Sequence, residues 1–87
     1  KFAPPKFEKI AIGSTKTQVV AALGEPDARP SASTDERGRR TDVWEYWEYE
    51  PLPGPDRLKQ KYQVVFVNDV VDSWGTAADS TQEIRLR

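Results

Sequence analysis

The stretch that decides the fold is IGSTKTQVVAALGEP, residues 12–26. Thr15 is a favourable helix N-cap, and Gln18 three residues later can close a capping box with it. Apolar side chains then recur at helical spacing, until Gly24 and a nearby proline end the pattern. We therefore predict a helix over residues 16–23. A helix of about two turns is not stable alone in water, so it must pack against another element.

Three runs rich in β-forming residues supply that partner. The clearest is DVWEYWEYE, residues 42–50, and two more at 61–67 and 70–74 flank a pair of residues suited to a tight hairpin turn. With a two-residue turn, Phe66 should oppose Val71 and Val64 should oppose Ser73. Alternation then places four side chains on one core face: Tyr62, Val64, Phe66 and Val71. The predicted fold class is α+β, with one or two short N-terminal helices packed on a three-stranded antiparallel β-meander. The first of these helices would be a single turn over residues 6–10.

Length and composition bound the organisation of the chain. Its 87 residues make one domain, with a core over about 6–75 and residues 76–87 as a tail or edge strand. The formal net charge of −1 gives no field that would recruit nucleic acid. Cysteine and histidine are absent, which removes thiol chemistry and the commonest proton-transfer side chain. These absences favour a binding protein over an enzyme.

Two segments carry no periodic pattern. Residues 27–41 are polar, and we interpret them as a loop whose part from Ser31 to Arg39 is mobile and dispensable for folding. Arginines make this loop locally basic, so a solvated loop and an anion-binding patch are both open, with the solvated loop favoured. Residues 51–56, PLPGPD, are a long hairpin connection.

No group of residues has the spacing of a catalytic or metal site. The segment Ser14–Lys16 lacks a base close in sequence, and a helix cap explains it better than a nucleophile does. Acidic residues around the 68–69 turn lack the spacing of a calcium loop. Glu45 and Glu48 lie on opposite faces of their strand, so they cannot act on one substrate. We expect no cofactor, no metal and no enzymatic activity.

Specific residues resemble a known family. The run KIAIGST at residues 9–15, the pairs Gln18-Val19 and Leu23-Gly24, and Pro26 resemble the signature of the SmpA/OmlA (BamE-like) lipoproteins. In that family the helix segment leads to an aromatic strand and a hairpin, which resemble residues 42–46 and 66–71 here. Ser14 departs from the family, which has a methionine before the cap, so Ile10 or Ile12 must cover that flank.

The resemblance implies a function as well as a fold. Members are outer-membrane lipoproteins of the β-barrel assembly machinery, so it implies a periplasmic location, a protein partner in the cell envelope and no nucleic acid. The chain starts at Lys1, and we expect the family's lipidated cysteine to lie upstream of it. The helix-and-sheet unit also resembles that of β-lactamase-inhibitor proteins. A secreted inhibitor or ligand-sensing module is therefore the alternative function.

The aromatic strand predicts where a partner binds. The helix can cover only one face of the sheet, and the resemblance suggests that Trp44 and Tyr46 face inward. Aromatic residues on the other face would then be exposed, and such residues anchor interfaces. We predict a partner-binding surface made of Trp47, Tyr49, Val65 and Trp74.

Overall fold

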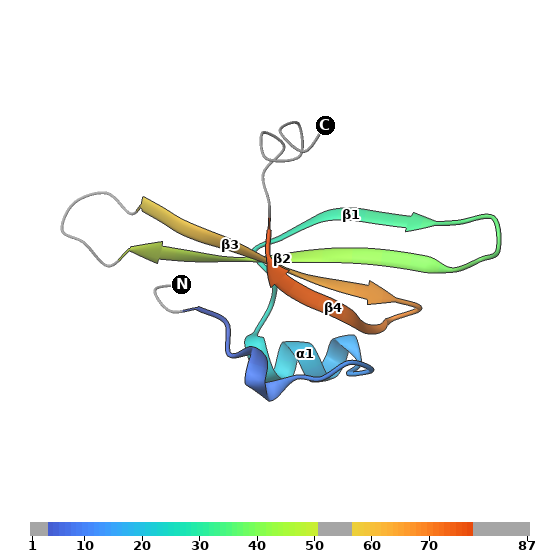
Figure 1. Cartoon of the computed structure of the whole chain (residues 1–87), viewed down its shortest axis with the longest axis horizontal. Helices are drawn as coiled ribbons and strands as arrows, with labels where there is room; N and C mark the ends of the chain where they lie inside the picture. The colour runs from blue at the N-terminus through green and yellow to red at the C-terminus, as the bar shows by residue number, and fades with distance from the viewer. Residues whose placement is uncertain (1–3, 51–56, 78–87) are drawn as a thin grey trace.

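One helix and one antiparallel sheet make up the domain (Figure 1). The computed structural model describes residues 4–50 and 57–77. Within them a 3₁₀ turn, η1 (Phe7–Lys9), precedes helix α1 (Lys16–Leu23). Four strands follow in the order β1-β2-β3-β4: β1 (Ala28–Thr34), β2 (Arg40–Glu50), β3 (Arg57–Val67) and β4 (Val70–Thr76). None of the helices in these ranges is long and apolar enough to cross a membrane.

Helix α1 has the ends that its sequence predicts. The Thr15 side chain accepts a hydrogen bond from the Gln18 backbone N–H (3.1 Å), and the Gln18 side chain accepts one from the Thr15 N–H (2.8 Å). Gly24 ends the helix at φ 86°, a conformation that a residue with a Cβ rarely adopts. The capping box and the glycine stop therefore set the length of α1, and the prediction over residues 16–23 is confirmed.

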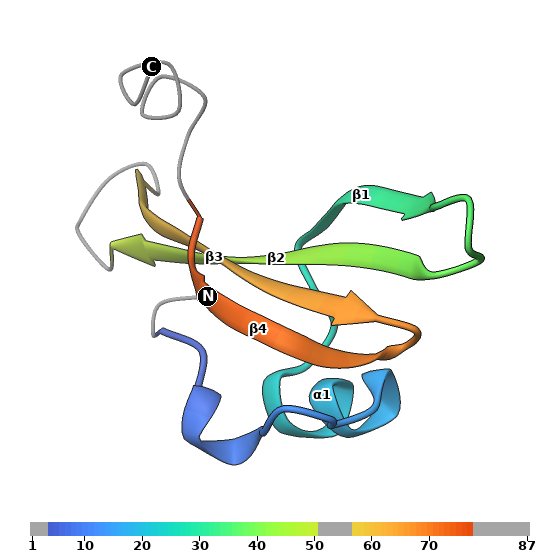
Figure 2. The same ribbon diagram turned by 45° about the vertical axis from the view of Figure 1, so that its right-hand side comes forward.

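The core lies between α1 and one face of the sheet, as Figure 2 shows with the helix beneath the sheet. From residue 41 to residue 49, strand β2 alternates between half-buried and buried positions, and Trp44 and Tyr46 are both on the buried side. Its neighbours in the core are Ile10, Val19, Val64, Phe66 and Val71. This arrangement confirms the expected inward position of Trp44 and Tyr46 and the packing of α1 on the sheet.

The segment before α1 also closes one edge of the sheet. The Gly13 N–H donates to the Val71 carbonyl, and the Val71 N–H donates to the Ser14 carbonyl, both at 2.8 Å. Gly13 has φ 93°, which allows the chain to turn from this pairing into the helix cap. Ile10 is buried on this side, whereas Ile12 is 66% exposed, so Ile10 alone covers the flank left open by Ser14.

The predicted three-stranded meander is wrong, because the sheet has a fourth strand. Strand β1 lies within residues 27–41, which we interpreted as a loop, and it pairs antiparallel with β2 from Ser31↔Val43 to Thr34↔Arg40. Only residues 35–39 form a turn, and Asp35 accepts hydrogen bonds from the backbone N–H groups of Arg37 and Arg39. The segment from Ser31 to Arg39 is therefore half strand and half hydrogen-bonded turn rather than an irregular loop.

A register shift in β4 corrects a second expectation. The 68–69 turn predicts that Val64 opposes Ser73, but Val64 pairs with Trp74, because a bulge lies between the Phe66↔Val71 and Val65↔Ser73 pairs. A bulge adds one residue to a strand and so changes which face the following side chains occupy. Trp74 consequently lies on the helix side of the sheet.

Two other predicted segments lie outside the described residues. One is the connection at 51–56, although the antiparallel pairing of Glu50 with Arg57 is described on either side of it. The other is the tail or edge strand at 76–87, of which only residues 76 and 77 are described. Thr76 is the last residue of β4.

Candidate functional site

The sheet face opposite α1 is the candidate site. No described helix or strand packs on this face, and we call it the open face. Every second side chain of β2 lies on the open face, because side chains alternate along a strand. The residues that pair with these positions in β3 and β4 lie on the same face. They are Thr41, Val43, Glu45, Trp47 and Tyr49, together with Leu58, Lys61, Gln63, Val65, Val67, Val70 and Ser73.

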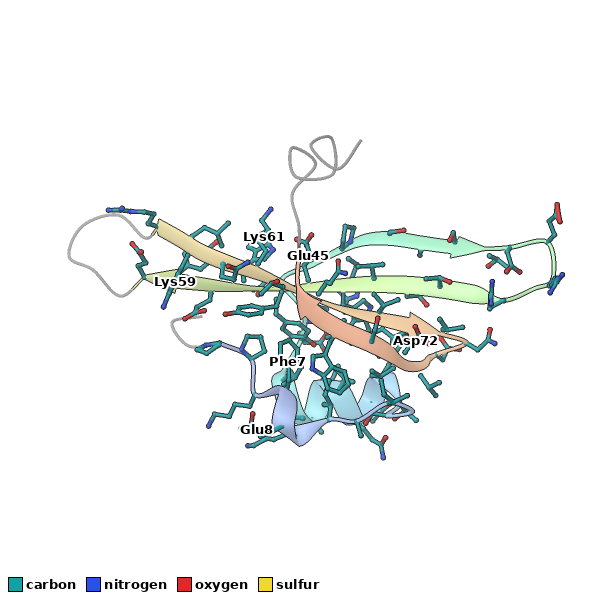
Figure 3. All side chains as sticks on the ribbon, in the orientation of Figure 1. Phe7, Glu8, Glu45, Lys59, Lys61 and Asp72 are labelled. Atoms are coloured by element: carbon teal, nitrogen blue, oxygen red, sulfur yellow. The ribbon has the colours of Figure 1, made fainter. Side chains whose placement is uncertain are left out.

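Trp47 is held in one position on the open face. Its indole N–H donates to the Glu45 carboxylate at 2.8 Å, and the Lys61 ammonium lies 5.4 Å from its ring centroid. The Trp47 backbone N–H also donates to the Asp27 carboxylate at 2.7 Å. Figure 3 shows Glu45 and Lys61 on the side of the sheet away from α1. A fixed, half-buried ring offers contact area to a partner at little cost in side-chain entropy.

Four valines form the apolar centre of the open face. Val43 pairs with Val65, and Val67 pairs with Val70, so the four side chains occupy adjacent positions on three strands. Val70 is 37% exposed and the other three are half-buried. Ser31 and Ser73 flank them, so the residues paired with Val43 and Val65 on the outer side have small side chains.

The structure brings together three of the four residues predicted for a partner surface. Trp47, Tyr49 and Val65 lie on the open face. Trp74 does not, because its ring stacks on Phe7 with centroids 6.0 Å apart, on the side of η1. Sequence reasoning missed four apolar residues of this face: Val43, Leu58, Val67 and Val70. The alternation of β3 contained the signal for Val67, but the identity of its neighbours required the register.

Charged residues on the helix side have structural partners. Asp42 is 4% exposed and accepts from the Lys16 ammonium at 2.8 Å and from Arg40 Nε at 3.1 Å. The hydrogen bond from Arg40, and then that from Lys16, lowers the pKa of the Asp42 carboxyl. Lys16 also pairs with Asp69 at 3.0 Å. This network fastens the start of α1 to β2 and to the β3–β4 turn.

Two buried polar groups at the other end of the core are also satisfied. The Tyr46 hydroxyl donates to the Gly24 carbonyl at 2.9 Å, and burial, followed by the charge of Glu25, raises its pKa to about 12. Glu48 is 5% exposed and accepts from the Tyr62 hydroxyl at 2.7 Å, with the Lys59 ammonium 3.5 Å away. Each group has an evident structural partner, and the arrangement does not resemble an acid–base pair.

A groove lies beside α1 on the same side of the sheet. It has a volume of about 340 Å³ and is lined by Lys16, Thr17, Val20, Glu25, Arg29 and Trp44. The Arg29 guanidinium lies over the Trp44 ring at 5.2 Å, and it pairs with Glu25 at 3.0 Å. The groove therefore has an apolar floor and charged walls, with two basic residues and one acidic residue.

Metal chemistry and known relatives give no indication of what the candidate site binds. Within residues 4–50 and 57–77, no group of three or more acidic, histidine or cysteine residues could hold a metal ion. No protein-family model, no curated protein and no solved structure matches the chain. The open face and the groove therefore have to be interpreted from their own geometry.

Proposed function

We propose that this domain is a non-catalytic protein-binding module that presents the open face to a partner in the bacterial cell envelope. The observation that supports the proposal is a sheet face on which no described helix or strand packs, with an apolar centre and a fixed tryptophan beside it. Extended apolar patches on small domains mark interaction sites. Tryptophan is among the residues that contribute most to binding energy.

The charged residues of the open face fit a partner that is not strongly charged. Glu45 and Lys61 flank Trp47, so the tryptophan lies between one negative and one positive group. A neighbouring surface of mixed polarity would bury the valines and keep the two charges at the rim. Such an arrangement, with an apolar centre and a polar rim, is usual for protein interfaces.

The envelope setting rests on the resemblance of residues 9–26 to the SmpA/OmlA lipoproteins. In this proposal the domain acts as an accessory module on the periplasmic face of the outer membrane, held by a lipid anchor on a cysteine upstream of Lys1. Its partner is a component of the barrel-assembly machinery or another envelope protein. Residues 9–26 include α1 and its capping residues, which pack on the other side of the sheet from the open face.

The proposal is tested by site-specific crosslinking in envelope preparations. A photoreactive phenylalanine analogue replaces Val43 or Val65 on the open face, and Ala21, an exposed residue of α1, carries it in the matched control. We expect a discrete crosslinked partner from the two sheet positions and none from α1. Crosslinks from α1 alone would overturn the proposal.

Replacing the tryptophan gives a second test with a quantitative readout. Trp47→Ala should weaken capture of the crosslinked partner at least tenfold, which corresponds to about 1.4 kcal/mol. The variant should keep the melting temperature within a few degrees, because Trp47 is outside the core cluster. Normal capture by a folded Trp47→Ala protein would contradict the assignment of the open face.

A further inference from the structure

The outer edge of β1 carries backbone groups that no described strand pairs. Arg40 directs both of its backbone groups toward the β3–β4 turn: its N–H donates to the Asn68 side chain (3.0 Å) and its carbonyl accepts from the Asn68 N–H (2.8 Å). Thr34, opposite Arg40, therefore points its N–H and C=O away from β2. Ala32, two residues earlier on the strand, does the same.

The two edges of the sheet differ in whether another described segment of the chain pairs with them. At β4, the backbone of residues 13–15 pairs with Val70 and Val71. At β1, residues 31–34 are Ser-Ala-Ser-Thr, all exposed, with none of the charged side chains that usually discourage strand addition. Pro30 and the register shift between Ala28 and Ser31 lie just before this stretch and do not interrupt it. Small, uncharged side chains allow another strand to approach closely.

The groove lies on the helix side of the same edge. Ala32 pairs with the buried Asp42, so its side chain faces the helix side, and alternate residues of an added strand would face that side too. Arg29, which covers the Trp44 floor, is held by Glu25 through an ion pair whose side chains are 56% and 72% exposed. Such exposed pairs are weak, so a large apolar side chain can displace Arg29 from the ring.

We propose that the outer edge of β1 binds an extended, uncharged segment of a partner polypeptide as a fifth strand of the sheet. The segment pairs through the backbone groups of Ala32 and Thr34, and it places a large apolar side chain against Val20 and Trp44 in the groove. This surface is separate from the open face, so the domain has two independent contacts with other chains.

Amide hydrogen exchange and NMR titration with synthetic peptides test the proposal. The probe is a capped eight-residue peptide of alternating threonine and leucine, compared with a peptide in which alanine replaces each leucine. In the free protein we expect fast exchange at Ala32 and Thr34 and protection at Ser31 and Ser33. The leucine peptide should slow exchange at Ala32 and Thr34 at least tenfold. Shifts confined to Val43 and Val65 would instead place the peptide on the open face and overturn the proposal.

A proline substitution isolates the backbone contribution. Ala32→Pro removes an N–H that points outward, so the ladder to β2 stays intact, and peptide affinity should fall at least tenfold. Ala32→Val keeps that N–H and should bind as the unmodified protein does. If the Ala32→Pro variant is unfolded, the exchange measurement on the unmodified protein still tests whether the peptide pairs with β1. Equal binding by both folded variants would overturn the proposal.

A substitution on α1 isolates the groove. Thr17→Trp fills the groove from an exposed position and should abolish the preference for leucine over alanine peptides. Ala21→Trp, also exposed on α1 but outside the groove lining, should preserve that preference. Sedimentation of the free protein tests whether a second copy of the chain pairs with this edge instead. A dimer that becomes monomeric in the Ala32→Pro variant would assign the edge to a second copy and overturn the proposal.

Discussion

The two faces of β2 have similar composition but opposite roles. On the helix side, Trp44 and Tyr46 are buried between an acidic residue at either end, Asp42 and Glu48, and both of those acids are satisfied by partners. On the open face, Trp47 and Tyr49 alternate with Glu45 and stay half-buried. Tryptophan, tyrosine and glutamate thus occur on both faces. What covers a face, rather than its composition, determines whether it stabilises the fold or remains available to a partner.

Truncating one residue on each face gives the largest expected difference. Phe66 is fully buried on the helix side, and Phe66→Ala should lower the free energy of unfolding by about 3–5 kcal/mol. Its neighbour Val65 is half-buried on the open face, and Val65→Ala should cost less than about 1 kcal/mol. Urea denaturation of both variants measures the difference. Similar losses would show that the open face is covered in solution.

The buried carboxylate should contribute the next largest effect. Asp42→Asn weakens the bonds from Lys16 and Arg40 and should cost about 1.5–3 kcal/mol at neutral pH. Because the folded protein holds the pKa of Asp42 below its usual value, this contribution is present above about pH 4 and is lost as the pH falls through the folded pKa.

Acid denaturation followed by circular dichroism measures this pH dependence. The Asn variant should lose less stability than the unmodified protein between neutral pH and pH 3. Asp72→Asn, an exposed position on β4, is the control and should follow the unmodified protein. An Asp42→Asn protein with an unchanged acid profile would contradict the role of the network.

A smaller effect is expected for the Tyr46 hydroxyl. Tyr46→Phe removes its hydrogen bond to Gly24 and should cost about 1 kcal/mol at neutral pH. The folded pKa of about 12 lies above the ordinary value near 10, so stability is full below about pH 10 and falls as the pH rises toward 12. Thermal melts from pH 8 to 11.5 should show a shallower alkaline decline for the Phe variant.

The smallest effect belongs to the open face. Lys61→Ala removes the cation above the Trp47 ring, a contact worth about 0.5–1 kcal/mol at an exposed site. The variant should change the melting temperature by only a few degrees while altering the tryptophan fluorescence. A loss comparable to that of Phe66→Ala would mean that the open face contributes to the core.

The sequence predicted the elements whose signals are local. The capping box, the glycine stop and the strand alternation all depend on residues within a few positions of one another, and each has the expected position. Strand β1 has no such signal, because its side chains face solvent on both sides and need no apolar alternation. The turn sequence Asp35-Glu36-Arg37-Gly38, with aspartate first and glycine fourth, was the available indication of a hairpin.

The sequence by itself determined that a capped helix packs on an aromatic, antiparallel sheet, and that Trp44 and Tyr46 share a face opposite Trp47 and Tyr49. Only the tertiary structure decided the number of strands and the position of Trp74. The reason is physical: a period of two fixes which side chains share a face within a strand, but pairing between distant segments fixes the register. One extra residue in β4 moved Trp74 from the open face to the helix side, and no local pattern encodes that insertion.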